Sequence, residues 1–153
     1  MKKIFIGADH GGFELKIELC DYLTTQFVEF EDLGIYSSDS VDYPDIASKV
    51  CNLVNKDNNS FGVLICGTGV GISIAANKHR NIRAALCHDT YTAKMARAHN
   101  DANVLCMGGR IIGKEVAKEI LSVFLNVDFE GGRHKRRLDK ITELEKTEFN
   151  SPV

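Results

Sequence analysis

Short apolar runs alternate with helical patterns along most of the chain, and this alternation constrains the fold more than any other feature. Each run is about the length of a strand, and the runs lie at residues 3–8, 28–33, 62–66, 82–87 and 104–107. Between them, residues 44–54 and 116–124 place apolar side chains on one stripe of a helix. The pattern predicts a doubly wound, Rossmann-like α/β domain, a five-stranded parallel sheet with helices on both faces.

The length of the chain predicts one domain. A chain of 153 residues can bury a full core without staples. We expect this domain to occupy residues 1–147. The segment from Glu130 onward departs from the alternation and predicts a charged C-terminal helix, and we expect residues 148–153 to form a flexible tip.

Charge and cysteine content narrow the class of protein. The formal net charge of −2 gives no general attraction to nucleic acid or to anionic membranes. No stretch approaches the roughly 20 apolar residues of a membrane span or resembles a signal peptide, so we expect a soluble cytoplasmic protein. The five cysteines are an odd number with no C-x-x-C pair, which predicts free thiols rather than disulfides or a thiolate zinc site.

Reactive side chains follow the predicted strands. In a sheet of this kind ligands bind outside the carboxyl ends of the strands, so these residues are candidates for the site. An aspartate at a strand end is also a common helix N-cap, and a single histidine is usually an ordinary surface residue. The residues concerned are Asp9, His10, Cys66, His88, Asp89, Gly108, Gly109 and Arg110.

The loop after the third strand has the composition of an anion cradle. Glycines at 67 and 69 let a ligand approach the backbone N–H groups, and a helix is predicted to begin near Val70. The start of that helix would favour the thiolate of Cys66, and Thr68 offers a hydroxyl nearby. The alternative is that Cys66 is a small buried apolar side chain.

Three known phosphate-binding motifs do not match this loop. Ile72 stands where the dinucleotide fingerprint needs a third glycine, although Asp89 lies where a ribose-binding carboxylate would. Ile72 also stands where a phosphatase-type cysteine loop needs arginine, and the P-loop lysine is missing. The mismatches disfavour a nucleotide-binding oxidoreductase and favour Cys66 as a base rather than a nucleophile.

Two further stretches supply candidate groups. A helix is predicted to end at His99 with Asn100 as its C-cap, which favours the protonated imidazole of a proton donor or is simply an ordinary capped end. In the basic segment 131–137, helical spacing puts Arg133 and Arg137 on one face, suited to a phosphate. A solvated face or a nucleic-acid contact is the alternative, but no aromatic residues interleave the segment.

Five motifs together resemble the type B ribose-5-phosphate isomerases, which belong with the galactose-6-phosphate and allose-6-phosphate enzymes. The resemblance extends from residue 2 to about residue 147. The motifs are GADHGGFELK, DYPDIA, ICGTGVGISIAANK, RAHNDANVL and EGGRHKRR.

The resemblance implies roles for most of these candidates. Cys66 would be the base that takes the proton from C2 of the open-chain sugar, assisted by Thr68, while His99 would open the furanose ring. Asp9 and Asn100 would bind the sugar. The enediolate oxygen would be held by the amides of Gly67, Thr68, Gly69, Val70 and Gly71, and the phosphate by His10, Arg110, Arg133 and Arg137.

The resemblance also implies an assembly and a reaction. The family generally forms homodimers with sites at the subunit interface. His99, Asn100 and Arg110 would then belong to a site whose base comes from the partner subunit. A tetramer is the alternative assembly. The expected reaction interconverts ribose 5-phosphate and ribulose 5-phosphate in the pentose phosphate pathway, without metal or cofactor. An isomerase for a six-carbon sugar phosphate and a non-catalytic phosphate-ligand sensor are the remaining alternatives.

Overall fold

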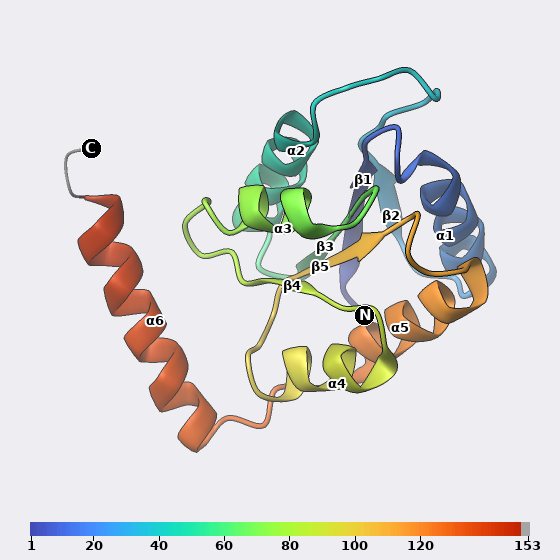
Figure 1. Ribbon diagram of the computed structural model, residues 1–153. Coiled ribbons are helices and arrows are strands. Elements are labelled where there is room, and N and C mark those ends of the chain that lie inside the picture. The colour runs from blue at the N-terminus through green and yellow to red at the C-terminus, as the bar shows by residue number, and fades with distance from the viewer. Residues whose placement is uncertain (151–153) are drawn as a thin grey trace.

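Five parallel strands form one sheet in the order β2-β1-β3-β5-β4 (Figure 1). The computed structural model describes residues 1–150. The predicted α/β architecture is confirmed by this sheet and by the helices on its two faces. The strands are β1 (Lys3–Ala8), β2 (Phe30–Asp32), β3 (Ser60–Cys66), β4 (Ala84–Leu86) and β5 (Val104–Gly108).

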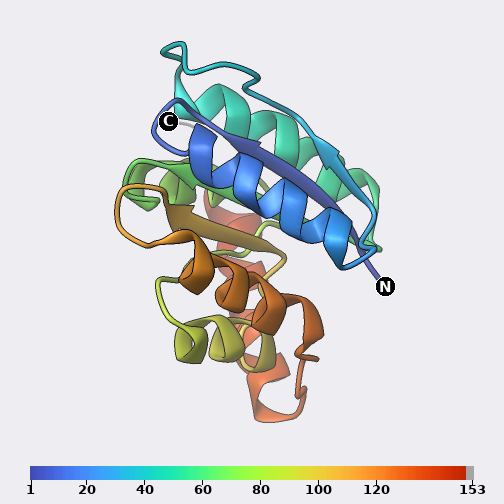
Figure 2. The same ribbon diagram turned by 90° about the vertical axis from the view of Figure 1, so that its right-hand side faces the viewer.

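The helices cover the sheet in two layers. Helices α1, α4 and α5 pack on one face, and Figure 2 turns α1 and α5 toward the viewer; α2 and α3 pack on the other face. Within residues 1–150, no helix is long and apolar enough to cross a membrane. The helices are α1 (Phe13–Thr25), α2 (Tyr43–Lys56), α3 (Val70–Ala76), α4 (Thr90–Ala98), α5 (Lys114–Asn126) and α6 (Arg133–Phe149).

Alternate residues of the central strands fill two separate cores. Ile4 and Ile6 of β1 pack toward α1 and α5, whereas Phe5 between them packs toward α2. Both faces of the central strands are therefore apolar, which explains why they appear in the sequence as unbroken apolar runs.

The two edge strands are shorter than the apolar runs predicted. Strand β2 covers only residues 30–32 of the run 28–33, and β4 covers residues 84–86 of the run 82–87. Val28, Ile82 and Cys87 are nevertheless buried in the core. An apolar run in the sequence indicates buried residues rather than paired ones. At an edge strand, which pairs on one side only, the buried residues continue beyond the hydrogen-bonded ladder.

A buried lysine ties α1 to β2. The side chain of Lys16 is 1% exposed, and its Nζ donates to both carboxylate oxygens of Asp32, at 2.7 and 2.9 Å, and to the carbonyl of Ile35. Asp32 also accepts the N–H of Gly34 at 2.9 Å. This network fixes the start of the long connection from β2 to α2.

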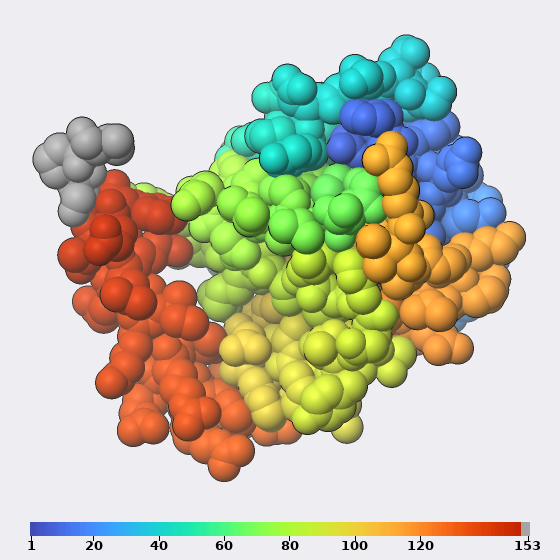
Figure 3. Space-filling view, viewed as in Figure 1, coloured from blue at the N-terminus to red at the C-terminus, as the bar shows by residue number. Residues whose placement is uncertain are grey.

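The last helix stands apart from the rest of the molecule. Figure 3 shows α6 as a ridge along one side of the body, and its buried residues are His134 and Leu138. The predicted charged C-terminal helix is thus present. It includes residues 148 and 149, which we expected in a flexible tip, while residues 151–153 of that tip lie outside the described residues.

Candidate active site

The carboxyl ends of β1, β3 and β5 meet at one edge of the sheet. Ala8 of β1 pairs with Ile65, and Cys66 pairs with Gly108 of β5. Because β2 and β3 lie on opposite sides of β1, the chain reverses its winding between β1 and β3, where ligand crevices form in open α/β sheets. At this point Asp9 follows β1 and Cys66 is the last residue of β3.

Cys66 ends β3 with its sulfur turned into the glycine loop. The residue is 4% exposed, and the backbone N–H of Gly69 donates to Sγ at 3.1 Å. An N–H aimed at sulfur stabilises the thiolate more than the thiol. Its burial fits the alternative of a small apolar side chain, and the N–H at its sulfur fits the candidate base.

Burial disfavours the thiolate of the other four cysteines. It raises the pKa of Cys20 and Cys51 to about 12 and that of Cys87 to about 11, and it raises the pKa of Cys106 well above its ordinary value. All five cysteines are free, as predicted. These four are protonated at neutral pH and chemically quiet.

The glycine loop packs too closely against its neighbours to hold side chains. Gly69 has φ of +76°, and a Cβ there would lie 2.9 Å from the carbonyl oxygen of Met107. A Cβ on Gly11 would lie 2.8 Å from the backbone N of Gly67. Glycine is required at both positions, the first for its backbone conformation and the second for the close approach of two chain segments.

Two of the loop amides are engaged inside the loop. Gly69 donates to Cys66, and Val70 donates to Oγ1 of Thr68 at 3.2 Å. Thr68 is exposed, and its hydroxyl oxygen contacts its own loop. The helix begins at Val70, as predicted.

Asp9 and His10 lie beside this loop with different exposure. Asp9 is buried and its Oδ1 accepts the N–H of Gly11 at 2.9 Å. His10 is exposed, and its Nδ1 accepts the N–H of Val41 from the connection before α2. The carboxylate is held firmly, while the imidazole remains open to a ligand.

Arg110 lies beside the glycine loop of its own chain. Its Nη1 is 3.0 Å from the position that a Cβ on Gly67 would take, and its backbone N–H donates to the Gly67 carbonyl at 3.0 Å. Its cationic group therefore faces the loop that follows Cys66. The resemblance had grouped Arg110 with His99, whereas one chain holds it near Cys66.

Two neighbours of this site were not singled out as site residues by the sequence. The Tyr43 ring lies 2.6 Å from the position of a Cβ on Gly71, so it covers the start of α3. The sequence feature that could have identified Tyr43 is its position in the DYPDIA motif. His88 was noted only as a strand-end residue; its Nε2 accepts the N–H of Gly108 at 3.0 Å.

Asp89 has the structural role that was its alternative. Its side chain caps α4 by accepting the N–H of Thr92 at 2.6 Å, and this hydrogen bond is the first cause that lowers the pKa of Asp89. The carboxylate is committed to the helix start, where negative charge is favourable.

The remaining candidates lie at the other end of the sheet. Helix α4 runs against the direction of the strands (Figure 1). His99 at its end therefore lies near the amino end of β5, whereas Cys66 is at the carboxyl end of β3. The predicted cap is wrong by one residue: α4 ends at Ala98 and His99 is its C-cap, because Asp101 at φ of +43° reverses the chain. Asn100, Arg133 and Arg137 are exposed. Asn100 follows His99 in the chain, and both arginines are on α6, whose His134 stacks on His99.

Comparison with known proteins identifies the family. The model of the Ribose/Galactose Isomerase family matches residues 4–141. The chain belongs to this family. Among curated relatives, ribose-5-phosphate isomerase B of Escherichia coli K12 is 50% identical over 145 residues, covering 95% of this chain and 97% of that protein. A putative sugar phosphate isomerase of Bacillus subtilis, YwlF, is 46% identical over 144 residues, covering 94% and 97%.

Solved structures of the family have the same fold. Ribose-5-phosphate isomerase B of Clostridium thermocellum has a TM-score of 0.93 at 49% identity and covers 95% of this chain and 98% of its own. The Thermotoga maritima structure of a ribose 5-phosphate isomerase has a TM-score of 0.91 at 51% identity, covering 93% and 98%. The family resemblance inferred from the five motifs is thereby confirmed.

Proposed function

We propose that this protein interconverts D-ribose 5-phosphate and D-ribulose 5-phosphate, as the names of its relatives in Escherichia coli and Clostridium thermocellum suggest. The observation that supports it best is the thiol of Cys66, which accepts an N–H of the glycine loop at the reversal point between β1 and β3. This thiol is the candidate base.

The chemistry requires one base and an oxyanion site. The Cys66 thiolate removes the proton from C2, the C2–H electron pair forms the C1–C2 double bond, and the carbonyl oxygen becomes an enediolate oxygen. The hydroxyl proton on O2 then moves to O1, the O2 electrons form the C2 carbonyl, and the electron pair of the C1–C2 double bond takes the proton back from the Cys66 thiol at C1. A placed base supplies roughly 10²- to 10⁴-fold, and each aimed oxyanion donor on the order of 10²- to 10³-fold.

The remaining candidates have roles around the reacting carbons. In this proposal Thr68 and the amides of residues 67–71 serve the base and the enediolate oxygen, and Asp9 and Asn100 bind sugar hydroxyls. His99 opens the furanose ring by proton transfer. The phosphate is bound by His10, Arg110, Arg133 and Arg137.

We propose a homodimer whose sites combine residues of both subunits. In one chain His99 and Cys66 are at opposite ends of the sheet, so a single subunit does not bring the two together. Exposed apolar side chains on α3 and on the edge strand β4 support a contact surface there: Val70, Ile74 and Leu86.

Further parts of the proposal follow from the chemistry and the composition. The reaction moves a proton and an electron pair within one molecule, so it requires no external redox partner. Residues 1–147 form the isomerase domain. The protein acts in the cytoplasm, where a reducing environment keeps its five cysteines as thiols.

A six-carbon sugar phosphate is the second candidate substrate, because the family description includes galactose. The two are separated by comparing kcat/KM on ribose 5-phosphate with that on allose and galactose 6-phosphates. The proposal expects the pentose to be preferred.

The deciding experiment is isomerisation of ribose 5-phosphate in deuterated water. We expect deuterium at C1 of the product, and loss of turnover by at least about 10³-fold in Cys66→Ala. Cys20→Ala, which changes a half-buried cysteine on α1, should retain activity. Binding of ribose 5-phosphate without any turnover would favour the sensor and contradict the proposal.

A further inference from the structure

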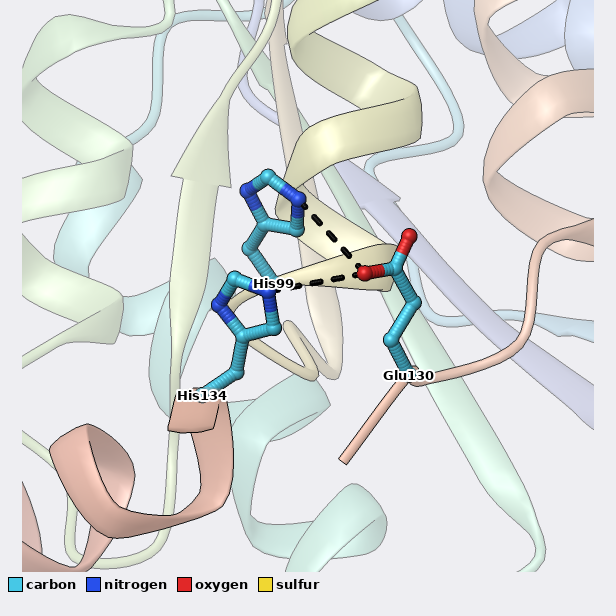
Figure 4. A group of neighbouring side chains, drawn as sticks. All are labelled: His99, Glu130 and His134. Carbon is cyan, nitrogen blue, oxygen red and sulfur yellow. Dashed lines mark ion pairs between the residues drawn. The ribbon is translucent and has the colours of Figure 1, made fainter. Parts of the chain in front are cut away.

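Three ionisable side chains come together beside the end of α4. The carboxylate of Glu130 lies 3.8 Å from Nε2 of His99 and 3.4 Å from Nε2 of His134, measured to the same oxygen, Oε2 (Figure 4). The two imidazole rings are stacked, with centroids 4.0 Å apart and planes 11° from parallel. His134 is buried and His99 is partly exposed.

The backbone holds this group in place. The N–H of Glu130 donates to the carbonyl of Ala98, the last residue of α4, at 3.0 Å. This bond links the connection before α6 directly to the residue next to His99. His134 is in the first turn of α6 and its ring stacks on that of His99, so the start of this helix is also fixed beside His99.

Two arginines hold the turn that follows His99. Nη1 of Arg97 donates to the carbonyl of Ala102 at 2.6 Å and to Asp101 at 2.9 Å, while its guanidinium lies over the Phe61 ring. Arg83 donates to the carbonyls of Asn100 and Asp101. His99 is therefore mounted on a rigid turn with a carboxylate on one side of its ring.

The geometry suits proton transfer better than metal binding. Parallel rings hold their in-plane Nε2 lone pairs side by side, whereas two imidazoles on one metal ion direct them to a single point. A carboxylate facing Nε2 favours the tautomer with hydrogen on that nitrogen and stabilises the imidazolium. Nδ1 of His99 is then the nitrogen left to exchange a proton.

We propose that Glu130 and His134 are positioning residues for His99: the carboxylate sets its tautomer and charge, and the stacked ring of His134 sets its orientation. This inference rests on the proposed function, in which His99 opens the sugar ring. It adds a carboxylate–histidine pair to that step and assigns the acid–base role to Nδ1.

The surroundings of His134 disfavour its protonated form. Burial lowers the pKa of His134, and the charges of His99, Arg133 and Arg137 act in the same direction, opposed by Glu130. His134 is therefore harder to protonate than an ordinary histidine, although it lies nearer to the carboxylate than His99 does.

The test uses one substrate that needs ring opening and one that does not. Ribose 5-phosphate is cyclic, whereas ribulose 5-phosphate is acyclic because its C5 oxygen is phosphorylated. We expect Glu130→Gln to lower kcat/KM for ribose 5-phosphate about tenfold or more and to move the alkaline limb of the pH profile to lower pH. Exchange of the C1 proton of ribulose 5-phosphate with deuterated water should stay near wild type.

The controls separate this inference from the function. Asp128→Asn, two residues earlier and exposed, should leave both readouts unchanged. Glu130→Asp should recover part of the loss, and His134→Phe, which keeps a stacked ring, should lose less than Glu130→Gln. An inactive wild type would refute the proposed function; an active wild type with equal Glu130→Gln and Asp128→Asn rates, or with both readouts lost together, would refute the role of Glu130.

Discussion

At the scale of single residues, the surroundings of each cysteine decide its chemistry. Cys66 and Cys106 both lie in the sheet and are almost fully buried. They differ in their contacts: Gly69 donates a backbone N–H to the sulfur of Cys66, while burial raises the pKa of the Cys106 thiol well above its ordinary value. Residue type and burial alone do not separate a candidate base from a core residue.

This contrast predicts selective alkylation. At pH 8 a thiol with a pKa of about 11 or 12 is ionised in about one molecule in a thousand or fewer, so Cys20, Cys51 and Cys87 should react slowly with iodoacetamide. Burial also raises the pKa of Cys106, so this thiol should react slowly too. We expect Cys66 to be labelled first. Mass spectrometry of peptides sampled over time measures the order of labelling.

The control for the alkylation is the variant without the reactive sulfur. Cys66→Ala should take up its first label at least about tenfold more slowly than wild type. Early labelling of Cys20, the half-buried cysteine on α1, would contradict the assignment.

At the scale of elements, ion pairs between segments position the loops around the site. Lys16 of α1 joins β2 and the following connection, and that connection reaches His10 through Val41. A lysine in the first half of a helix is usually solvent-exposed, so the sequence pattern gave no reason to place Lys16 inside.

The network around Lys16 predicts a specific loss of stability. Lys16→Met leaves Asp32 and the Ile35 carbonyl without their donor, and we expect the free energy of unfolding to fall by about 1–3 kcal/mol. Lys146→Met, which removes an exposed pair with Glu143 on α6, should change it by less than about 1 kcal/mol. Urea denaturation of both variants measures the difference; equal effects would contradict the role of Lys16.

Sequence reasoning located elements better than it located their edges. The central strands and the start of α3 follow directly from apolar runs and from the glycines after Cys66. Edge strands came out too long because burial continues beyond their ladders, as Val28 and Ile82 show. The end of α4 was missed by one residue because a positive φ at Asp101 has no clear signal in the sequence.

At the scale of the whole molecule, the candidate residues fall into two groups. Cys66, Asp9 and Arg110 lie at the carboxyl edge of the sheet, and His99 lies near the opposite edge. Spacing along the chain identified the members of each group, but not which members share a site. That division follows from direction: residues that end or follow the parallel strands lie at the carboxyl end of the sheet, whereas His99 ends a helix that returns to the amino end.

The shared-site proposal predicts recovery of activity in mixed subunits. Cys66→Ala and His99→Ala should each be inactive with ribose 5-phosphate. When equal amounts are mixed and the subunits exchange, half of the dimers are hybrids with one intact site each, so about a quarter of wild-type activity should appear.

The control for this experiment is each variant carried alone through the same exchange procedure. A site made entirely within one chain would give no recovery in the mixture. Such a result, in a mixture shown by native mass spectrometry to contain hybrids, would contradict the shared site.

The close packing of Gly11 against Gly67 has a consequence for substrate range. These two backbone segments leave no room for a Cβ on Gly11, so a substitution there would displace the chain. A change toward a longer or shorter sugar would therefore depend on the surrounding side chains, Thr68, Tyr43 and His10, which are exposed and can be replaced. Under the proposed function, the backbone at Gly11 and Gly67 would contact what all these sugars share, and the surrounding side chains would distinguish them.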